Sequence, residues 1–79
     1  MTNADNMRLS RHARKQMKWR RITVKDVEET ISSPDRLEKS IKGRKNAFKL
    51  IGSKLLKITY KTEKNNDIIV IIAMVKGEK

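Results

Sequence analysis

Lys54-Leu55-Leu56-Lys57-Ile58-Thr59-Tyr60-Lys61-Thr62 is the stretch that decides the fold of this chain. Its residues alternate in character, as they do in a β-strand whose successive side chains point to opposite faces of a sheet. One face carries Leu56, Ile58 and Tyr60. The other carries Leu55, Lys57, Thr59 and Lys61. The stretch therefore predicts a strand with one face in a core and one cationic face in solvent.

Strand-like segments lie on both sides of this stretch. Residues 45–51 alternate too and are joined to it by Gly52-Ser53, a typical hairpin turn. Residues 68–75 are apolar on both faces, which is typical of a central strand. Residues 36–41 are predicted to form a short edge strand. We place Phe48 on the core face, and Lys49 with Lys57 and Lys61 on the cationic face.

Two helices are expected before the strands. Ser10 is a good N-cap for a helix that ends near Arg20, with an apolar stripe of Leu9, Ala13 and Met17. Thr23 and Asp26 form a short capping box for a second helix. That helix carries an apolar stripe of Val24, Val27 and Ile31, and it ends before Pro34.

The predicted fold is α+β, with both helices on one face of a three- to four-stranded antiparallel sheet. A chain of 79 residues is expected to form one domain. We assign residues 9–75 to it, residues 1–8 to a flexible lead-in and residues 76–79 to a tail.

Composition restricts the possible partners. The formal net charge is +11, which favours a polyanion such as nucleic acid, an acidic protein or an anionic membrane surface. With no cysteine and one histidine, neither a disulfide nor a structural zinc site is expected, and no cofactor is implied. The longest apolar run has eight residues, too few to span a bilayer, so we expect a cytoplasmic protein.

His12 is the candidate proton carrier. It lies in a segment, Arg8 to Arg21, that holds seven Lys or Arg and no acid. In RNA cleavage a base takes the 2′-hydroxyl proton, an acid protonates the departing oxygen, and cations stabilise the charged phosphorane. The cations available for this work are Arg11, Arg14, Lys15, Arg44 and Lys45. The alternative is that His12 packs at the border of its helix and has no chemical role.

The cationic strand face has two interpretations as well. Lys49, Lys57 and Lys61 would bind phosphates and position a nucleic-acid strand. Alternatively they form a solvated outer face that protects the sheet from aggregation. Trp19 is expected to pack at the end of its helix rather than stack on a base. Tyr60 is expected in the core, so it does not supply an obvious second proton carrier.

Several short motifs occur in a recognisable order: Ser10-x-His12-Ala13-x-x-x-Met17, Arg21-Ile22-Thr23-x-x-Asp26-Val27-x-x-x-Ile31, Pro34-Asp35, Gly43-Arg44-Lys45-Asn46 and Lys57-Ile58-Thr59-Tyr60. Together they resemble a family of small proteins placed near the RelE and BrnT toxins, within the barnase–colicin–RelE group of ribonuclease folds. The resemblance covers roughly residues 9–73.

The resemblance implies a RelE-like fold and a metal-independent RNA endonuclease of a toxin–antitoxin system. His12 would carry the proton, and Arg44, Lys45 and Lys57 would bind phosphate and stabilise the transition state. Arg11, Arg14, Lys15, Lys49 and Lys61 would hold the RNA, with ribosome-bound messenger RNA as one form of it. The free protein would be a monomer, and an acidic antitoxin would cover the basic face in a hetero-oligomer. The alternatives are a nucleic-acid-binding module without chemistry and a basic face that binds an acidic protein.

Overall fold

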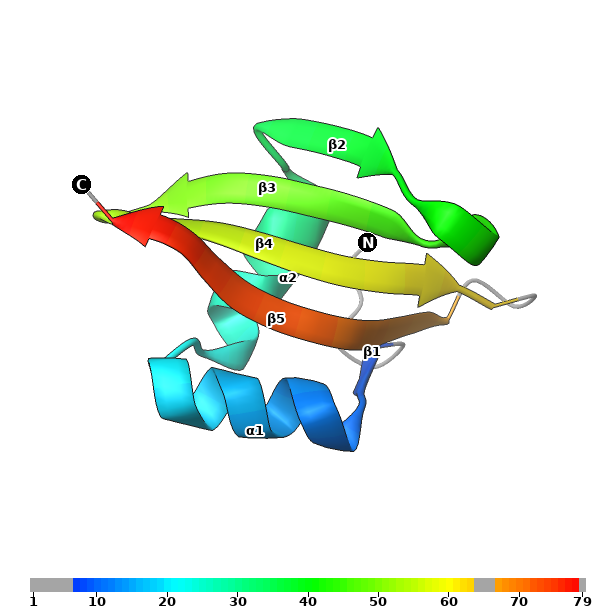
Figure 1. The fold of residues 1–79 in the computed structure, drawn as a ribbon, viewed down its shortest axis with the longest axis horizontal. Coiled ribbons are helices and arrows are strands. Elements are labelled where there is room, and N and C mark those ends of the chain that lie inside the picture. The colour runs from blue at the N-terminus through cyan, green and yellow to red at the C-terminus, as the bar shows by residue number, and fades with distance from the viewer. Residues whose placement is uncertain (1–6, 64–66, 79) are drawn as a thin grey trace.

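Strand β4 lies at the centre of a five-stranded sheet with the order β1-β5-β4-β3-β2 (Figure 1). The structure is a computed structural model that describes residues 7–63 and 67–78. In chain order the elements are β1 (Met7–Leu9), α1 (Arg11–Arg20), α2 (Val24–Ser32), β2 (Arg36–Lys39), a short 3₁₀ turn (Ile41–Gly43), β3 (Lys45–Ile51), β4 (Lys54–Thr62) and β5 (Ile68–Glu78). Two helices and a single sheet confirm the predicted α+β class.

The sheet is mixed, so the prediction of three or four antiparallel strands was wrong. Strands β2 to β5 pair in antiparallel fashion, but β1 pairs in parallel with the first residues of β5. Met7 and Arg8, assigned to a flexible lead-in, belong to this extra strand, and so does Leu9. The rest of that lead-in, residues 1–6, lies outside the described residues, as does residue 79. Residues 76–78, expected in a tail, continue β5 opposite Lys54 and Leu55.

Both helices begin where the sequence predicts. The Ser10 hydroxyl accepts a hydrogen bond from the Ala13 N–H at 3.0 Å, and α1 buries Ala13 and Met17. Thr23 and Asp26 complete the capping box of α2, which stabilises that helix because it satisfies two backbone N–H groups at its start.

Two predictions about helix side chains were wrong. Val24 is 47% exposed, and α2 buries Thr30 in addition to Val27. The Thr30 hydroxyl donates to the Asp26 carbonyl at 2.8 Å, which satisfies it inside the core. Trp19, expected to pack at the end of α1, is 79% exposed.

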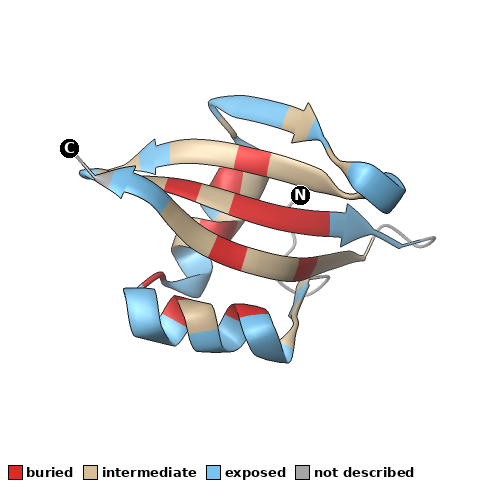
Figure 2. Ribbon diagram, in the orientation of Figure 1, coloured by how far each residue is buried: buried red, intermediate tan, exposed pale blue. Residues whose placement is uncertain are grey.

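The hydrophobic core lies between the helices and one face of the sheet (Figure 2). α1 packs along β5, while α2 packs on β3 and β4. The buried residues of the core are Ala13, Met17, Ile22 and Val27 from the helical segment and Ala47, Leu56, Ile58, Tyr60, Val70 and Ala73 from the sheet. Leu56, Ile58 and Tyr60 therefore face the helices, as their alternation predicts.

Strand β3 has the opposite phase to the one predicted. Ala47 pairs with Ile58, so Ala47 faces the helices and is fully buried. Phe48 pairs with Lys57, which places both on the face away from the helices. Lys49 pairs with Leu56 and lies on the helix side. The expected positions of Phe48 and Lys49 were thus exchanged.

Candidate nucleic-acid interface

The face of the sheet turned away from the helices is the broadest candidate surface. Within the described residues neither helix packs on it (Figure 1). We call it the open face. Strand register assigns to it Arg36 and Glu38 of β2, Asn46, Phe48 and Leu50 of β3, Leu55, Lys57, Thr59 and Lys61 of β4, and Ile69, Ile72 and Met74 of β5. It combines apolar and aromatic side chains with cations.

A row of side chains crosses the middle of the open face from β2 to β5. Arg36 pairs with Phe48, Phe48 with Lys57, and Lys57 with Met74. The Arg36 guanidinium carbon lies 5.8 Å from the centre of the Phe48 ring, and the Lys57 ammonium lies 6.0 Å from it. Both distances are within the range of a cation–π attraction. The row thus presents an aromatic ring between two positive charges.

A second row carries a fixed polar pair. The Thr59 hydroxyl donates to the Asn46 carboxamide oxygen at 2.7 Å. Thr59 is only 6% exposed, so this hydrogen bond satisfies a hydroxyl group that water scarcely reaches. The bond uses the oxygen of Asn46 and leaves its amide N–H groups as donors at the surface of the sheet.

The cations of the open face differ in their ionic partners. Arg36 pairs with Glu38, and Lys61 lies 3.6 Å from Glu63. No ion pair of Lys57 occurs among residues 7–63 and 67–78, so its charge is the least neutralised of the three. Both observed pairs are largely solvated, which keeps their net stabilisation small.

Lys49 does not belong to this surface. Its ammonium donates to the Ser33 carbonyl at 2.9 Å and lies 3.8 Å from the Asp35 carboxylate. The side chain is 17% exposed. Its charge therefore stabilises the segment that follows α2, on the helix side of the sheet.

Helix α1 covers the outer edge of β5 beyond β1. The Ser10 hydroxyl donates to the Ile71 carbonyl at 3.0 Å, and the Ala73 N–H donates to the Gln16 side-chain oxygen, also at 3.0 Å. Ile71 is the extra residue of a β-bulge, because Thr59 pairs with Ile72 and Tyr60 with Val70. These bonds protect the strand edge and fix α1 alongside β5.

His12 is exposed on α1, one turn before Gln16. Residues four apart lie on the same side of a helix, so His12 lies on the flank of α1 that runs along β5. Arg11, Arg14 and Lys15 are exposed around it. The His12 side chain makes no hydrogen bond or ion pair within the part of the chain that the structure describes.

Arg44 and Lys45 lie at the far side of the sheet from His12. Lys45 pairs with Tyr60, Tyr60 with Val70, and Val70 with Leu9. Lys45 on β3 therefore lies three strand spacings from Leu9 on β1, the strand that precedes α1 and His12. Three strand spacings amount to about 14 Å. The structure thus brings Lys57 to the centre of the open face, but it does not join His12, Arg44, Lys45 and Lys57 in one contacting cluster.

Tyr60, the only tyrosine, is buried, as its alternation predicts. Burial raises the pKa of its phenol above the ordinary value of 10.0, because the charged phenolate would lose its hydration. A core phenol with a raised pKa is a poor proton donor to a substrate at the surface.

This raised pKa predicts a loss of stability in alkali. Unfolding returns the phenol to its ordinary pKa, so on raising the pH the unfolded chain releases this proton before the folded chain does. The contribution of Tyr60 to the free energy of unfolding is therefore intact below about pH 10 and declines above it. We expect Tyr60→Phe to lack this part of the decline. Urea unfolding of both proteins from about pH 8 to about pH 11 measures the difference. Parallel pH curves would contradict the assignment to Tyr60.

The sequence prediction missed Arg36, Asn46 and Phe48 as parts of the candidate interface. A signal was available only in part: Asn46 and Phe48 share a parity, but the phase of β3 relative to β4 could not be read from it. Arg36 joins the row because of the pairing of β2 with β3.

Within residues 7–63 and 67–78, no three side chains of His, Asp or Glu come together as a metal site would require. No described helix has the length and apolar character needed to cross a bilayer.

Comparison with known proteins identifies a family for this chain. Residues 9–77 match the profile of a family described as a domain of unknown function, DUF4258. Neither the curated proteins nor the solved structures contain a significant match. The resemblance to the RelE and BrnT toxins stays a prediction.

Proposed function

The chain belongs to the DUF4258 family, and we propose that it is an RNA-binding domain whose open face holds a single strand. The observation that carries the proposal is the position of Phe48 between the Arg36 guanidinium and the Lys57 ammonium on a sheet face that no described helix covers. An aromatic ring beside two cations matches the two parts of a nucleotide, a flat base and a charged phosphate.

The chemistry of this row favours a single strand over a duplex. Bases stacked on aromatic side chains and phosphates held by cations are the usual contacts of single-stranded nucleic acid, and an open sheet is a common platform for them. A base in a duplex is not available for such stacking. The Asn46 amide donors next to this row supply hydrogen bonds to the edge of a base or to a sugar hydroxyl.

The distribution of charge also favours the open face as the side on which a nucleic-acid strand binds. Asp26, Glu28 and Glu29 are on α2, which packs on the opposite side of the sheet. The basic residues of α1 flank β5 at one side of the open face. A polyanion approaching the domain is therefore attracted more strongly to the open face and α1 than to α2.

Metal-independent RNA cleavage within a toxin–antitoxin system is the second candidate. It is favoured by the exposure of His12 on the flank of α1 that runs along β5, where a strand on the open face would pass. His12 would then act as the general base or acid, and Lys57 would bind the phosphate. Tyr60, in the core, would not be the second proton carrier. An acidic antitoxin is the corresponding protein partner.

Binding of a labelled single-stranded RNA at several salt concentrations, with a chelator present, tests both candidates. The RNA-binding proposal predicts a dissociation constant that rises steeply with salt, by a logarithmic slope of about 0.7 for each phosphate contact, and no shortened product. A product that His12→Ala abolishes while binding persists would establish the second candidate. Tight binding of an acidic peptide, with no binding of RNA at low salt, would contradict both.

A further inference from the structure

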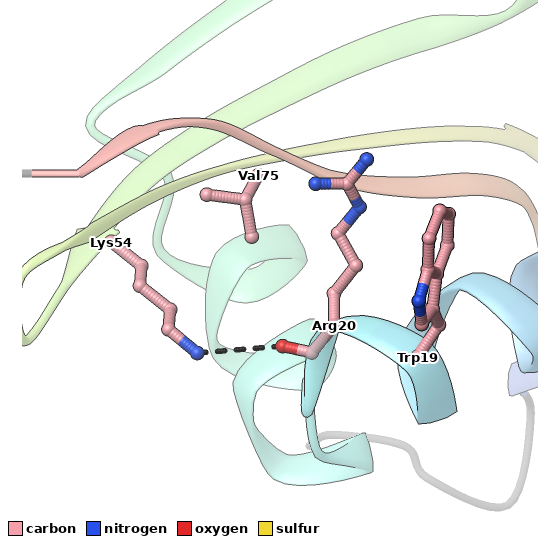
Figure 3. Close-up of a pocket in the computed structure, with 4 residues that line it drawn as sticks. All are labelled: Trp19, Arg20, Lys54 and Val75. Carbon is pink, nitrogen blue, oxygen red and sulfur yellow. Dashed lines mark hydrogen bonds between the residues drawn. The ribbon is translucent and has the colours of Figure 1, made fainter.

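A pocket lies at the C-terminal end of α1, on the helix side of the sheet. It has a volume of about 300 Å³ and is lined by Trp19, Arg20, Lys54 and Val75 (Figure 3). Val75 pairs with Leu56 of the core, and Lys54 pairs with Ile51, so both strand residues point away from the open face. The pocket is therefore a second site, separate from the row around Phe48.

Trp19 gives this pocket an aromatic wall. It is 79% exposed although it is the largest apolar side chain of the domain. The Arg20 guanidinium carbon lies 5.2 Å from the centre of its ring, within the range of a cation–π attraction. An indole that is solvated to this extent still offers most of its surface for stacking on a ligand.

Lys54 brings a second positive charge to the same place. Its ammonium donates to the Arg20 carbonyl at 3.4 Å, at the end of α1 where the helix carbonyls lack partners (Figure 3). This bond satisfies one of those carbonyls and holds the ammonium at the end of α1, while the Arg20 side chain extends away from it, so the two charges lie at separate points of the pocket (Figure 3). Val75 of β5 adds an apolar surface to the lining of the pocket.

We propose that this pocket binds one nucleotide, with the base stacked on Trp19 and the phosphate between the side chains of Arg20 and Lys54. A volume of about 300 Å³ is at the small end of the range for ligand pockets, so it suits a single nucleotide and not a longer segment. The nucleotide is either a free nucleoside monophosphate or the phosphorylated end of an RNA strand. The site does not depend on RNA binding by the open face.

Intrinsic fluorescence tests this site directly, because Trp19 is the only tryptophan in the chain. Titration with adenosine 5′-monophosphate is expected to quench the fluorescence in a saturable manner. Replacing both cations, Arg20→Ala with Lys54→Ala, is expected to weaken the apparent affinity about tenfold. Adenosine without the phosphate is expected to bind as weakly to the parent protein as the nucleotide does to this variant.

The matched control is Lys25→Ala with Lys39→Ala. It also removes two positive charges, from exposed positions outside the pocket, so quenching should be unchanged. An open-face variant, Phe48→Ala with Lys57→Gln, should also keep the quenching, which separates this site from the proposed function. A circular dichroism spectrum checks the fold of each variant.

Two outcomes would overturn the proposal: fluorescence unaffected by millimolar nucleotide, or equal quenching by an acidic peptide of the same charge. If binding occurs, a short RNA with a 5′-phosphate distinguishes the two sources of the nucleotide. Equal affinity for that RNA and for the monophosphate assigns the pocket to a strand end. Affinity for the monophosphate alone assigns it to a free nucleotide.

Discussion

Ile58→Ala is expected to lower the free energy of unfolding by about 2–5 kcal/mol. Ile58 is fully buried in the central strand, between Ala47 of β3 and Ala73 of β5. Since its neighbours on both sides are already small, they cannot expand to fill the space that the lost side-chain carbons leave. A domain of 79 residues has about 4–12 kcal/mol of total stability, so this one change removes a large part of it.

The matched control for this change is Ile41→Ala. Ile41 is 71% exposed in the 3₁₀ turn, and the substitution deletes the same atoms. We expect it to change the free energy of unfolding by no more than about 0.5 kcal/mol. Urea denaturation followed by circular dichroism measures both variants. Equal midpoints for the two would show that Ile58 is not at the centre of the core.

The central strand and the helix starts could be predicted because their signals are local. Alternation over nine residues fixed both the bounds and the buried face of β4. The side chains of Ser10 and Thr23 cap their helices by accepting a hydrogen bond from a backbone N–H only three residues further along the chain. Signals of this kind do not need knowledge of the partner element.

The phase of β3 could not be read from hydrophobicity, because size decided it. Phe48 is the more apolar residue, yet Ala47 faces the helices. A small side chain lets α2 approach the sheet closely, and the long chain of Lys49 can still reach the Ser33 carbonyl at the edge of the packed layer. The sequence pattern contains no information on how closely the helix approaches.

Strand β1 and the candidate interface depend on pairing between distant segments. Three residues, Met7–Leu9, are too few to show a period, and their partner begins at Ile68. The row of Arg36, Phe48 and Lys57 likewise exists only because three strands are aligned in one register. Cations could be identified in advance as candidates for phosphate contacts, but their neighbours on the sheet could not.

Neutralising the cations of the open face is expected to have the largest effect on RNA binding. In Arg36→Gln with Lys57→Gln and Lys61→Gln, we expect the logarithmic salt slope to fall by about 2, because three phosphate contacts of a single strand are lost. Affinity near 0.1 M salt should fall at least about tenfold, and by a similar factor for different RNA sequences. Lys57→Gln alone should account for about a third of the change in slope.

Lys49→Gln is the control that separates position from net charge. It removes the same charge as Lys57→Gln, from the paired strand but from the opposite face. We expect it to leave the salt slope unchanged and to cost about 1 kcal/mol of stability, through the lost bond to Ser33. Fluorescence anisotropy of a labelled RNA at several salt concentrations compares the variants. If Lys49→Gln and Lys57→Gln weaken binding equally, then RNA responds to the overall charge of the domain and the open face is not its contact surface.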